Sequence, residues 1–270
     1  MSNSMHYNGT DLSGTTYGLT VVRPTPRRIV ANPILSSNNV PQSYGGLAYC
    51  GGFGMVEIGA TVVCEGSSIS DLASKMDALK YLLNPMNGEK SIRFDHQSDR
   101  YWLGRLMNEI EAADIGDRSS QFDLRFLCSD SRAYGTTDRS SPDITISATP
   151  QVLTIEAAAA VVGTAPTNPT WVIKNTSGAT VSSLSLANAT TGETWAWTGT
   201  LINTTGWLRI TTGLGGKTEV STNSGGAWSD SNLGVTGQGF PTLAGNVQNS
   251  LTLTGLSGGT VVLTYTPRYL

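Results

Sequence analysis

The sequence RFDHQSDR contains the residue types that acid–base chemistry requires. Asp95, His96 and Asp99 could act as general acid and base, or bind a metal ion, if their side chains converged. Asp95 and His96 are adjacent, however, and point to opposite faces of an extended chain. Gln97-Ser98 also has the composition of a hairpin turn. The spacing therefore favours a solvated turn over a catalytic or metal site.

A second possible cation site is Asp114-Ile-Gly-Asp117, which offers two carboxylates beside a glycine. A calcium loop of the EF-hand type needs a longer series of oxygen ligands, so we expect a solvated loop tip here. The sequence has no P-loop, HExxH or CxxC spacing. We therefore predict no catalytic residue, no metal, no cofactor and no enzymatic activity.

Tryptophan gives a stronger signal for binding. Five of the six tryptophans lie in the second half of the chain, at Trp171, Trp195, Trp197, Trp207 and Trp228. In the sequence GWLRITT, Leu208 and Ile210 share one face of a strand, and Trp207 and Arg209 share the other. The apolar pair should face the core. Trp207 and Arg209 should then point outward, where they are candidate carbohydrate-binding residues.

The other tryptophans have different surroundings. Trp171 shares a strand face with Ile173, and Trp195 and Trp197 share a face opposite Ala196. These three side chains are expected in a core. Most of the tryptophans are therefore expected to serve packing or contact between subunits rather than sugar binding.

Composition limits the class of protein. The chain has 270 residues, a formal charge of −3, 14% charged residues and 31 glycines. The charge gives no electrostatic footprint for nucleic acid, and no apolar run approaches the roughly 18–20 residues that span a bilayer. The N-terminus lacks the pattern of a signal peptide. Cys50, Cys64 and Cys128 are widely spaced, which favours reduced thiols without a disulfide.

Charge divides the chain into two parts. Residues 1–140 hold 13 of the 17 Lys and Arg and 15 of the 20 Asp and Glu. We predict a first domain over 1–140, a Ser/Thr/Pro-rich linker over 141–150 and a second domain over 151–270. Residues 1–54 are rich in Gly, Pro and Asn and poorly periodic, which predicts a flexible N-terminal arm that is disordered or orders against neighbours.

The first domain has one clear helix, over residues 68–84, ending at Asn84-Pro85. Its apolar face should contain Ile69, Leu72, Met76, Leu79 and Leu83, and Ser68 with Asp71 fits a capping box. Alternating residues predict strands around it. In the sequence QFDLRFLC, one strand face should carry Phe122, Leu124 and Phe126, and in an earlier strand Ile92 and Phe94 should share a face.

Short alternating strands fill the second domain, separated by Gly, Asn and Ser turns. This pattern predicts a β-sandwich. The fold class is therefore mainly β, with one helix in the first domain and a sandwich in the second. Residues 156–162 are expected to form a strand that leads into a turn.

The order of elements over 83–135, which ends in SDSRAYG, resembles the distal tail protein family of long-tailed (siphovirus-type) bacteriophages. The sequence GFPTLAGN, with Ala244 where that family usually has proline, resembles its galectin-like or carbohydrate-binding-module-like C-terminal domain. The resemblance implies a structural protein of the virion tail tip, assembled in the host cytoplasm. It also implies a hexameric ring whose N-terminal domain forms the belt.

The same resemblance implies the partners. They are the tail tube protein, the tail hub, the tape measure protein that passes through the ring, and receptor-binding or side-fibre proteins. In several family members the last strand returns to the ring domain, so the last five residues are expected to do so here. Two alternatives from other classes are a carbohydrate-binding module of an adhesion device and a hydrolase of the bacterial envelope. The missing acid–base pair disfavours the hydrolase.

Overall fold

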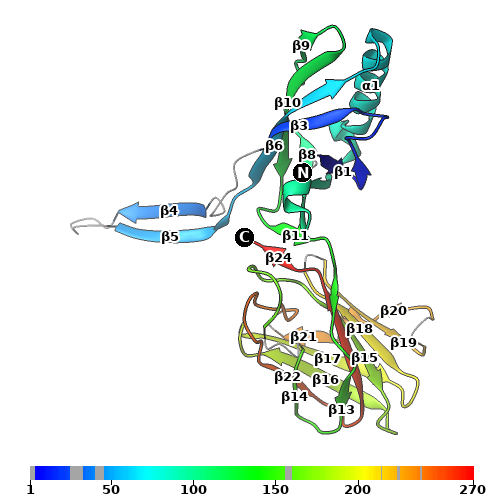
Figure 1. Cartoon of the computed structure of the whole chain (residues 1–270). Coiled ribbons are helices and arrows are strands. Elements are labelled where there is room, and N and C mark those ends of the chain that lie inside the picture. The colour runs from blue at the N-terminus through cyan, green and yellow to red at the C-terminus, as the bar shows by residue number, and fades with distance from the viewer. Residues whose placement is uncertain are drawn as a thin grey trace. The chain divides into compact units, whose positions relative to one another are not determined.

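The computed structural model describes residues 4–24, 33–39, 46–155, 160–213, 215–223, 226–237 and 239–270. The chain divides into two compact units: the first comprises Met1–Thr136 and Leu270, and the second Thr137–Tyr269. Both units consist mainly of β-strands, and α1 (Ile69–Leu82) is the one α-helix in the described ranges (Figure 1). The predicted fold class is confirmed. No helix in these ranges has the length and apolar character to cross a membrane.

An antiparallel sheet forms the body of the first unit. The strand order is β2-β1-β7-β8-β10-β6-β3, with β9 beside β10 and β11 beside β8. The strands are β1 (Met5–Tyr7), β2 (Thr10–Asp11), β3 (Leu19–Pro24), β6 (Val56–Glu65), β7 (Lys90–Phe94), β8 (Arg100–Leu106), β9 (Ala113–Gly116), β10 (Ser119–Cys128) and β11 (Ala133–Gly135). The strands β4 (Pro33–Asn39) and β5 (Gly46–Phe53) pair with each other in a separate sheet.

Strand alternation sets the core of this unit as the sequence predicts. Phe122, Leu124 and Phe126 of β10 are buried, whereas Asp123 and Arg125 between them are exposed. In β7 the buried pair is Ile92 and Phe94. Both predicted faces are confirmed.

The predicted flexible arm is wrong for residues 4–24. Met5, Tyr7, Leu12 and Leu19 are completely buried in the first core, and the ring of Tyr7 stacks on Phe126 with ring centroids 5.7 Å apart. The strands here are two to six residues long and joined by tight turns. Such short strands give little periodicity in sequence, although their apolar residues are buried by pairing with distant strands. Residues 25–32 and 40–45 of the same prediction lie outside the described residues, as does the side chain of Cys50.

Helix α1 covers the sheet with the apolar face that includes Leu72, Leu79 and Leu83, which are all buried. Met76 packs partly against the same core. Ile69 is 70% exposed, so its predicted place on this face is wrong. Side chains in a helix tilt toward its N-terminus, and at the first residue of α1 this direction leads past the end of the helix.

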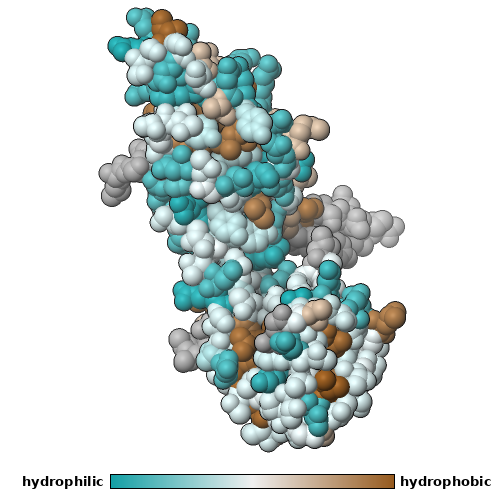
Figure 2. Space-filling model, turned by 90° about the vertical axis from the view of Figure 1, so that its right-hand side faces the viewer, coloured by the Kyte–Doolittle hydropathy of each residue, from teal (hydrophilic) through white to brown (hydrophobic). Residues whose placement is uncertain are grey.

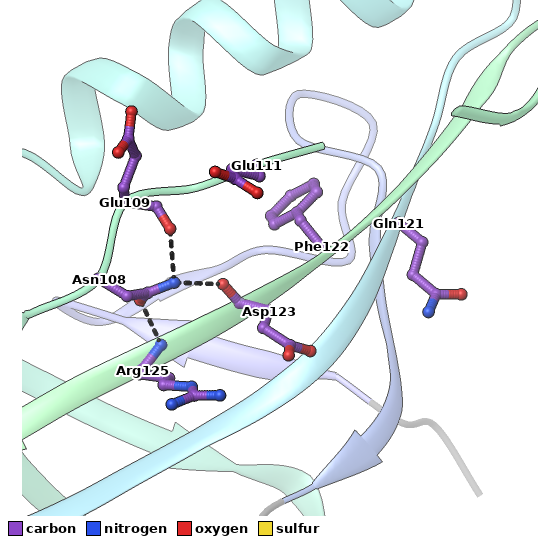
Figure 3. Close-up of a pocket in the computed structure, with 7 residues that line it drawn as sticks. All are labelled: Asn108, Glu109, Glu111, Gln121, Phe122, Asp123 and Arg125. Atoms are coloured by element: carbon purple, nitrogen blue, oxygen red, sulfur yellow. Dashed lines mark hydrogen bonds between the residues drawn. The ribbon is translucent and has the colours of Figure 1, made fainter. Parts of the chain in front are cut away.

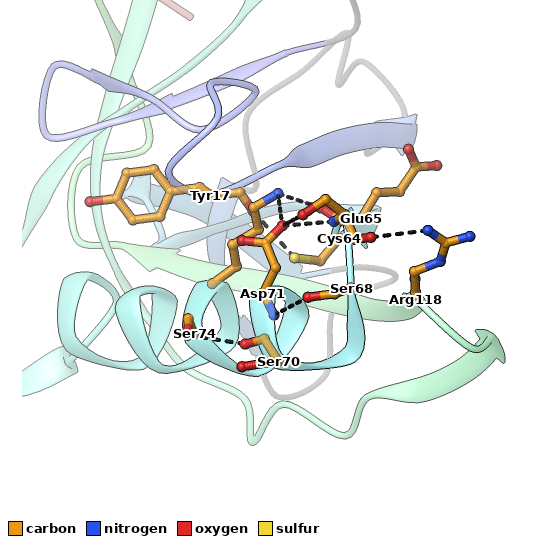
Figure 4. Close-up of polar contacts among 10 residues, drawn as sticks. Tyr17, Cys64, Glu65, Ser68, Ser70, Asp71, Ser74 and Arg118 are labelled. Atoms are coloured by element: carbon orange, nitrogen blue, oxygen red, sulfur yellow. Dashed lines mark hydrogen bonds and ion pairs between the residues drawn. The ribbon is translucent and has the colours of Figure 1, made fainter.

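The predicted capping box at the start of α1 is half confirmed. The Ser68 Oγ accepts a hydrogen bond from the Asp71 backbone N–H at 3.1 Å (Figure 4). The Asp71 carboxylate, however, accepts from the Ser67 backbone N–H (2.7 Å) and hydroxyl (2.9 Å), and these bonds lower the pKa of Asp71. Lys75 pairs with Asp71 at 3.2 Å and donates to the Glu65 carbonyl oxygen at 2.8 Å. These contacts bind the helix start to the end of β6.

Two further hydrogen bonds connect the end of β6 and the loop before α1 to neighbouring turns. Arg118 donates from Nη1 to the Ser67 carbonyl oxygen at 3.0 Å, and the Cys64 thiol donates to the Tyr17 carbonyl oxygen at 3.2 Å (Figure 4). Burial raises the pKa of Cys64. This thiol is therefore held protonated as a structural donor.

Two antiparallel sheets form the second unit. One has the order β12-β23-β15-β18-β19-β20, with β13 also paired to β23; its strands are β12 (Arg139–Ser140), β13 (Ile144–Ile146), β15 (Thr170–Asn175), β18 (Trp207–Thr211), β19 (Lys217–Ser221), β20 (Ser229–Asp230) and β23 (Gly259–Tyr265). The other has the order β14-β22-β16-β17-β21; its strands are β14 (Gln151–Leu153), β16 (Val181–Asn188), β17 (Glu193–Leu201), β21 (Val235–Gly237) and β22 (Leu251–Thr254).

The two sheets share one core, which makes this unit a β-sandwich. Trp171 from one sheet and Trp195 and Trp197 from the other are fully buried in it, as the sequence predicts. A buried tryptophan contributes a large apolar surface, so these three side chains hold the sheets together.

The predicted linker 141–150 contains a strand of the sandwich. Ile144–Ile146 forms β13, which pairs with β23, and Ile146 is buried in the core. The backbone hydrogen bonds of this segment come from a strand more than a hundred residues later, which local composition does not reveal. Within the predicted strand at 156–162, residues 156–159 lie outside the described residues.

Candidate functional site

The outer face of β18 carries the two residues that the sequence singles out for carbohydrate binding. Leu208 and Ile210 are fully buried in the sandwich core, whereas Trp207 and Arg209 are half-buried on the opposite face. The predicted strand parity is therefore confirmed. Whether Trp207 and Arg209 can bind a ligand depends on the contacts that they already make with neighbouring side chains.

Arg209 is engaged on both sides. Its Nε and Nη2 donate to Glu219 Oε2 of β19 at 2.8 and 2.7 Å. The guanidinium carbon lies 4.3 Å from the centroid of the Trp228 ring, which is a cation–π contact. These interactions hold Arg209 in place and neutralise its charge.

Trp207 has a different cation beside it. The Lys174 Nζ lies 5.2 Å from the centroid of the Trp207 ring, because Lys174 and Trp207 are cross-strand partners in β15 and β18. No acidic side chain pairs with Lys174 within the described ranges. The sequence alone does not predict that Lys174, Glu219 and Trp228 lie beside Trp207 and Arg209, because their proximity depends on the register between strands.

The strand register places these residues in regular rows across the outer face. The first row is Thr264, Thr170, Thr211 and Lys217; the second is Val262, Val172, Arg209 and Glu219; the third is Thr260, Lys174, Trp207 and Ser221. Most of these side chains are short or uncharged. In the third row, Trp207 and Lys174 are the two large side chains, because Thr260 and Ser221 are small.

A hollow of about 430 Å³ lies beside β10 in the first unit (Figure 3). The side chain of Asn108, which lines the hollow, is bound to the backbone of β10. Its Oδ1 accepts from the Arg125 backbone N–H at 2.8 Å, and its Nδ2 donates to the Asp123 carbonyl oxygen at 2.9 Å. The lining has carboxylates at Glu109, Glu111 and Asp123, but no histidine, cysteine or serine. It therefore lacks a serine or cysteine nucleophile with a histidine base.

The residues of RFDHQSDR do not form a catalytic group either. Asp95 accepts a hydrogen bond from the Ser4 hydroxyl at 2.5 Å and contacts His6 Nε2 at 3.2 Å. His96 is exposed, and its ring lies 5.5 Å from that of Phe94. Asp99 pairs with Arg100 at 3.2 Å. Asp95 thus connects β1 to the end of β7. His96 and Asp99 contact other residues and do not converge on Asp95.

Two further sequence patterns have structural explanations. Gly255–Gly259 has the GxSxG spacing of nucleophilic serines, but it forms the turn between two strands in a unit whose sequence contains no histidine. Asp114, in the other pattern, accepts a hydrogen bond from the Ser120 hydroxyl at 2.6 Å on the exposed strand β9. Across the described parts of the chain, no group of three or more potential metal ligands is present.

Comparison with known proteins relates this architecture to phage tails. Residues 12–128 match the family model described as the phage tail protein RIFT-related domain. The whole chain is similar to the crystal structure of the Dit protein of phage SPP1, with a TM-score of 0.74 and 17% sequence identity over 100% of both chains. The chain has the fold of a phage distal tail protein. The resemblance seen in the sequence is thereby confirmed.

The SPP1 protein is described as a paradigm of the hub adsorption apparatus of phages that infect Gram-positive bacteria. A weaker likeness, with a TM-score of 0.49 and 9% identity over 98% of each chain, is to a chain of the activated baseplate of phage p2. No curated protein sequence is significantly similar to this chain.

Proposed function

We propose that this protein is a structural component of a phage tail tip, forming a hexameric ring that joins the tail tube to the tail hub. The observation that carries the proposal is the pair of likenesses: a phage tail domain over residues 12–128 and a distal tail protein fold over the whole chain. The protein acts by assembly and not by catalysis.

The first unit has backbone edges suited to ring formation. β3 lies at one end of the main sheet and pairs on one side only within the described residues, and β4 and β5 pair only with each other there. Unpaired edges are templates for another chain. A ring repeats one head-to-tail interface, and an obligate interface of this kind buries on the order of 2,000 Å² or more.

The partners follow from the same role. One side of the ring docks on the tail tube protein and the other on the tail hub, while the tape measure protein and then DNA pass through the lumen without sequence-specific recognition. The second unit carries receptor-binding or side-fibre proteins. The protein is assembled in the host cytoplasm and ends in the virion.

Electron microscopy and analytical ultracentrifugation of the full-length protein, over a range of concentrations, test the ring directly. The expected result is a six-fold ring, with a mass six times that of the chain. The matched experiment images the tail tips of phage particles that contain the protein. A chain that is monomeric in solution and also in the particle contradicts the proposal.

The returning C-terminus is a further part of this proposal. Thr164 and Ala165 donate their backbone N–H groups to the Arg268 carbonyl oxygen at 2.9 and 3.0 Å, so the second unit holds the chain at this residue. We expect the last five residues to contact the first unit or a neighbouring subunit. Deleting Arg268–Leu270 should loosen the two units without unfolding either; limited proteolysis between the units measures this, and an unchanged cleavage rate counts against it.

Carbohydrate binding by the second unit is the second candidate function, favoured by the half-buried position of Trp207. A tryptophan outside the core presents an apolar ring face to which sugars can stack. Loss of saccharide binding in Trp207→Ala with unchanged thermal stability supports this role. A loss of several kcal/mol of stability instead indicates that the side chain serves packing.

A further inference from the structure

We infer that Lys174 and Trp207 together bind an anionic glycan on the outer face of β15 and β18. The inference rests on the proposed sugar-binding role of the second unit. It changes the cation that serves this role, from Arg209 to Lys174, and it specifies the class of saccharide: a polymer whose sugars carry anionic groups.

The availability of the charge decides between the two cations. Arg209 already donates twice to Glu219, at 2.8 and 2.7 Å, and its guanidinium lies over Trp228. A ligand that took Arg209 would have to leave Glu219 without its partner, which costs free energy. Lys174 has no acidic partner in the described part of the chain. An anionic ligand at Lys174 therefore breaks no ion pair and replaces only the cation–π contact with Trp207.

The aromatic ring and the charge lie within reach of one sugar unit. The Lys174 Nζ is 5.2 Å from the Trp207 ring centroid. The cation–π contact keeps the two groups together before a ligand arrives. A pyranose ring that stacks on the indole displaces the ammonium from the ring, and an anionic substituent of the sugar then becomes the partner of the ammonium.

The neighbouring side chains leave this site accessible. Thr260 is the neighbour of Lys174 along the row and Val172 its neighbour along the strand, and both are short and half-buried. Arg209 and Glu219 fill the adjacent row and together carry no net charge. They are positioning residues that define one wall of the site.

Binding of full-length protein to phosphomannan, with enzymatically dephosphorylated mannan as the neutral counterpart, tests the inference. Lys174→Gln should weaken binding to phosphomannan about tenfold, since a hydrogen bond to a charged group is lost. It should leave binding to the neutral mannan unchanged. Trp207→Ala should weaken binding to both polymers. Lys217→Gln is the matched control, because Lys217 is an exposed lysine at the end of the first row, away from any indole.

Several results overturn the inference. Absence of binding to phosphomannan does so, as does equal weakening by Lys174→Gln and Lys217→Gln. Equal affinity for poly-L-glutamate indicates an acidic protein partner instead of a glycan. Equal affinity of the native protein for both mannans means that the anion has no role. Ring assembly of each variant, measured separately, distinguishes these failures from a failure of the proposed tail-tip function.

Discussion

The two units hold their turns and loops with different polar chemistry. In the first unit, aspartates accept hydrogen bonds from neighbouring backbone and side chains, as Asp71, Asp95 and Asp130 do. In the second unit, the buried asparagines Asn175, Asn188 and Asn249 hold loops and turns, together with the carboxylate of Glu193. Six ion pairs lie within the first unit, whereas Arg209 and Glu219 form one in the second.

The asparagines fix the irregular parts of the sandwich. Asn249 accepts from the Ala244 backbone N–H at 2.9 Å and donates to its carbonyl oxygen at 3.0 Å, and Asn188 donates to Asn249 Oδ1 at 3.0 Å. The half-buried Glu193 also holds the turn GFPTLAGN, because its Oε2 accepts from the Thr242 backbone N–H at 2.6 Å and from the Thr242 hydroxyl at 2.7 Å, but the fully buried contacts of the turn are made by amides. A neutral amide costs less to bury than a carboxylate, so these side chains can lie inside the unit.

The surfaces differ in the same direction. On the face shown in Figure 2, the first unit is largely hydrophilic, whereas the second unit has mostly intermediate hydropathy. A surface of Ser, Thr and Gly around few charges suits a unit that displays Lys174 and Trp207 to a partner. Among the described residues, the two carboxyl groups with a lowered pKa, Asp71 and Asp130, lie in the first unit, so we expect acid to destabilise the first unit more than the second.

The largest expected effect comes from removing a buried amide. Asn175 donates to the carbonyl oxygens of Ala179, Leu201 and Ile202 and accepts twice from Ser177. Asn175→Ala should reduce the free energy of unfolding of the second unit by about 2–4 kcal/mol, because these groups remain buried without partners. Calorimetry at pH 5 and pH 8 should give the same loss. A loss below about 1 kcal/mol, the net worth of a single hydrogen bond, contradicts the role of the asparagines.

Gly163→Ala tests the hold of the second unit on the end of the chain. Gly163 has φ of 113°, and a Cβ there would lie 2.6 Å from the Arg268 carbonyl oxygen. The substitution should cost about 1–3 kcal/mol through backbone strain. Hydrogen exchange at Thr164 and Ala165 should accelerate, while exchange in the first unit stays unchanged. Protected amides in the variant would show that the contact has little effect.

Asp130 tests the charge-based chemistry of the first unit. Its partial burial would raise its pKa, but hydrogen bonds from Arg132 and Tyr134 outweigh this and lower the pKa below the usual value. A lowered carboxyl pKa stabilises the folded state at neutral pH. Asp130→Asn should therefore cost about 1 kcal/mol at pH 7.

The pH dependence of that difference distinguishes the carboxylate from simple packing. The difference between native and variant protein should be full above about pH 5. It should disappear as the pH falls from about 4, the unfolded pKa, through the lower folded pKa. Chemical denaturation at pH 7, 4 and 3 measures it. A difference that persists at pH 3 contradicts the electrostatic explanation.

The smallest expected effect is at an exposed ion pair. Lys80 and Asp77 lie 2.9 Å apart on α1 with about three quarters of each side chain exposed. Lys80→Ala should change stability by less than about 0.5 kcal/mol. Thermal unfolding in low salt provides the measurement. A larger loss would mean that surface charges contribute more to the first unit than the partly buried aspartates.

Features that depend on local periodicity could be predicted from the sequence alone. The alternation in β10 and β18, the apolar face of α1 and its Ser68 cap follow from side chains two to four residues apart, where backbone geometry sets which face each occupies. The phage tail resemblance also depends on the order of such elements. For the same reason, strand parity alone is enough to place Trp207 and Arg209 on the outer face.

Which distant residues meet is a property of the tertiary structure. Residues 4–24 belong to the first core, and β13 belongs to the sandwich, because their partners lie far along the chain, at β7 and β23. Register across strands places Lys174 beside Trp207 and Glu219 beside Arg209. A shift of one residue in either pairing would send these side chains to different neighbours. The candidate site therefore depends on long-range pairing that local sequence does not encode.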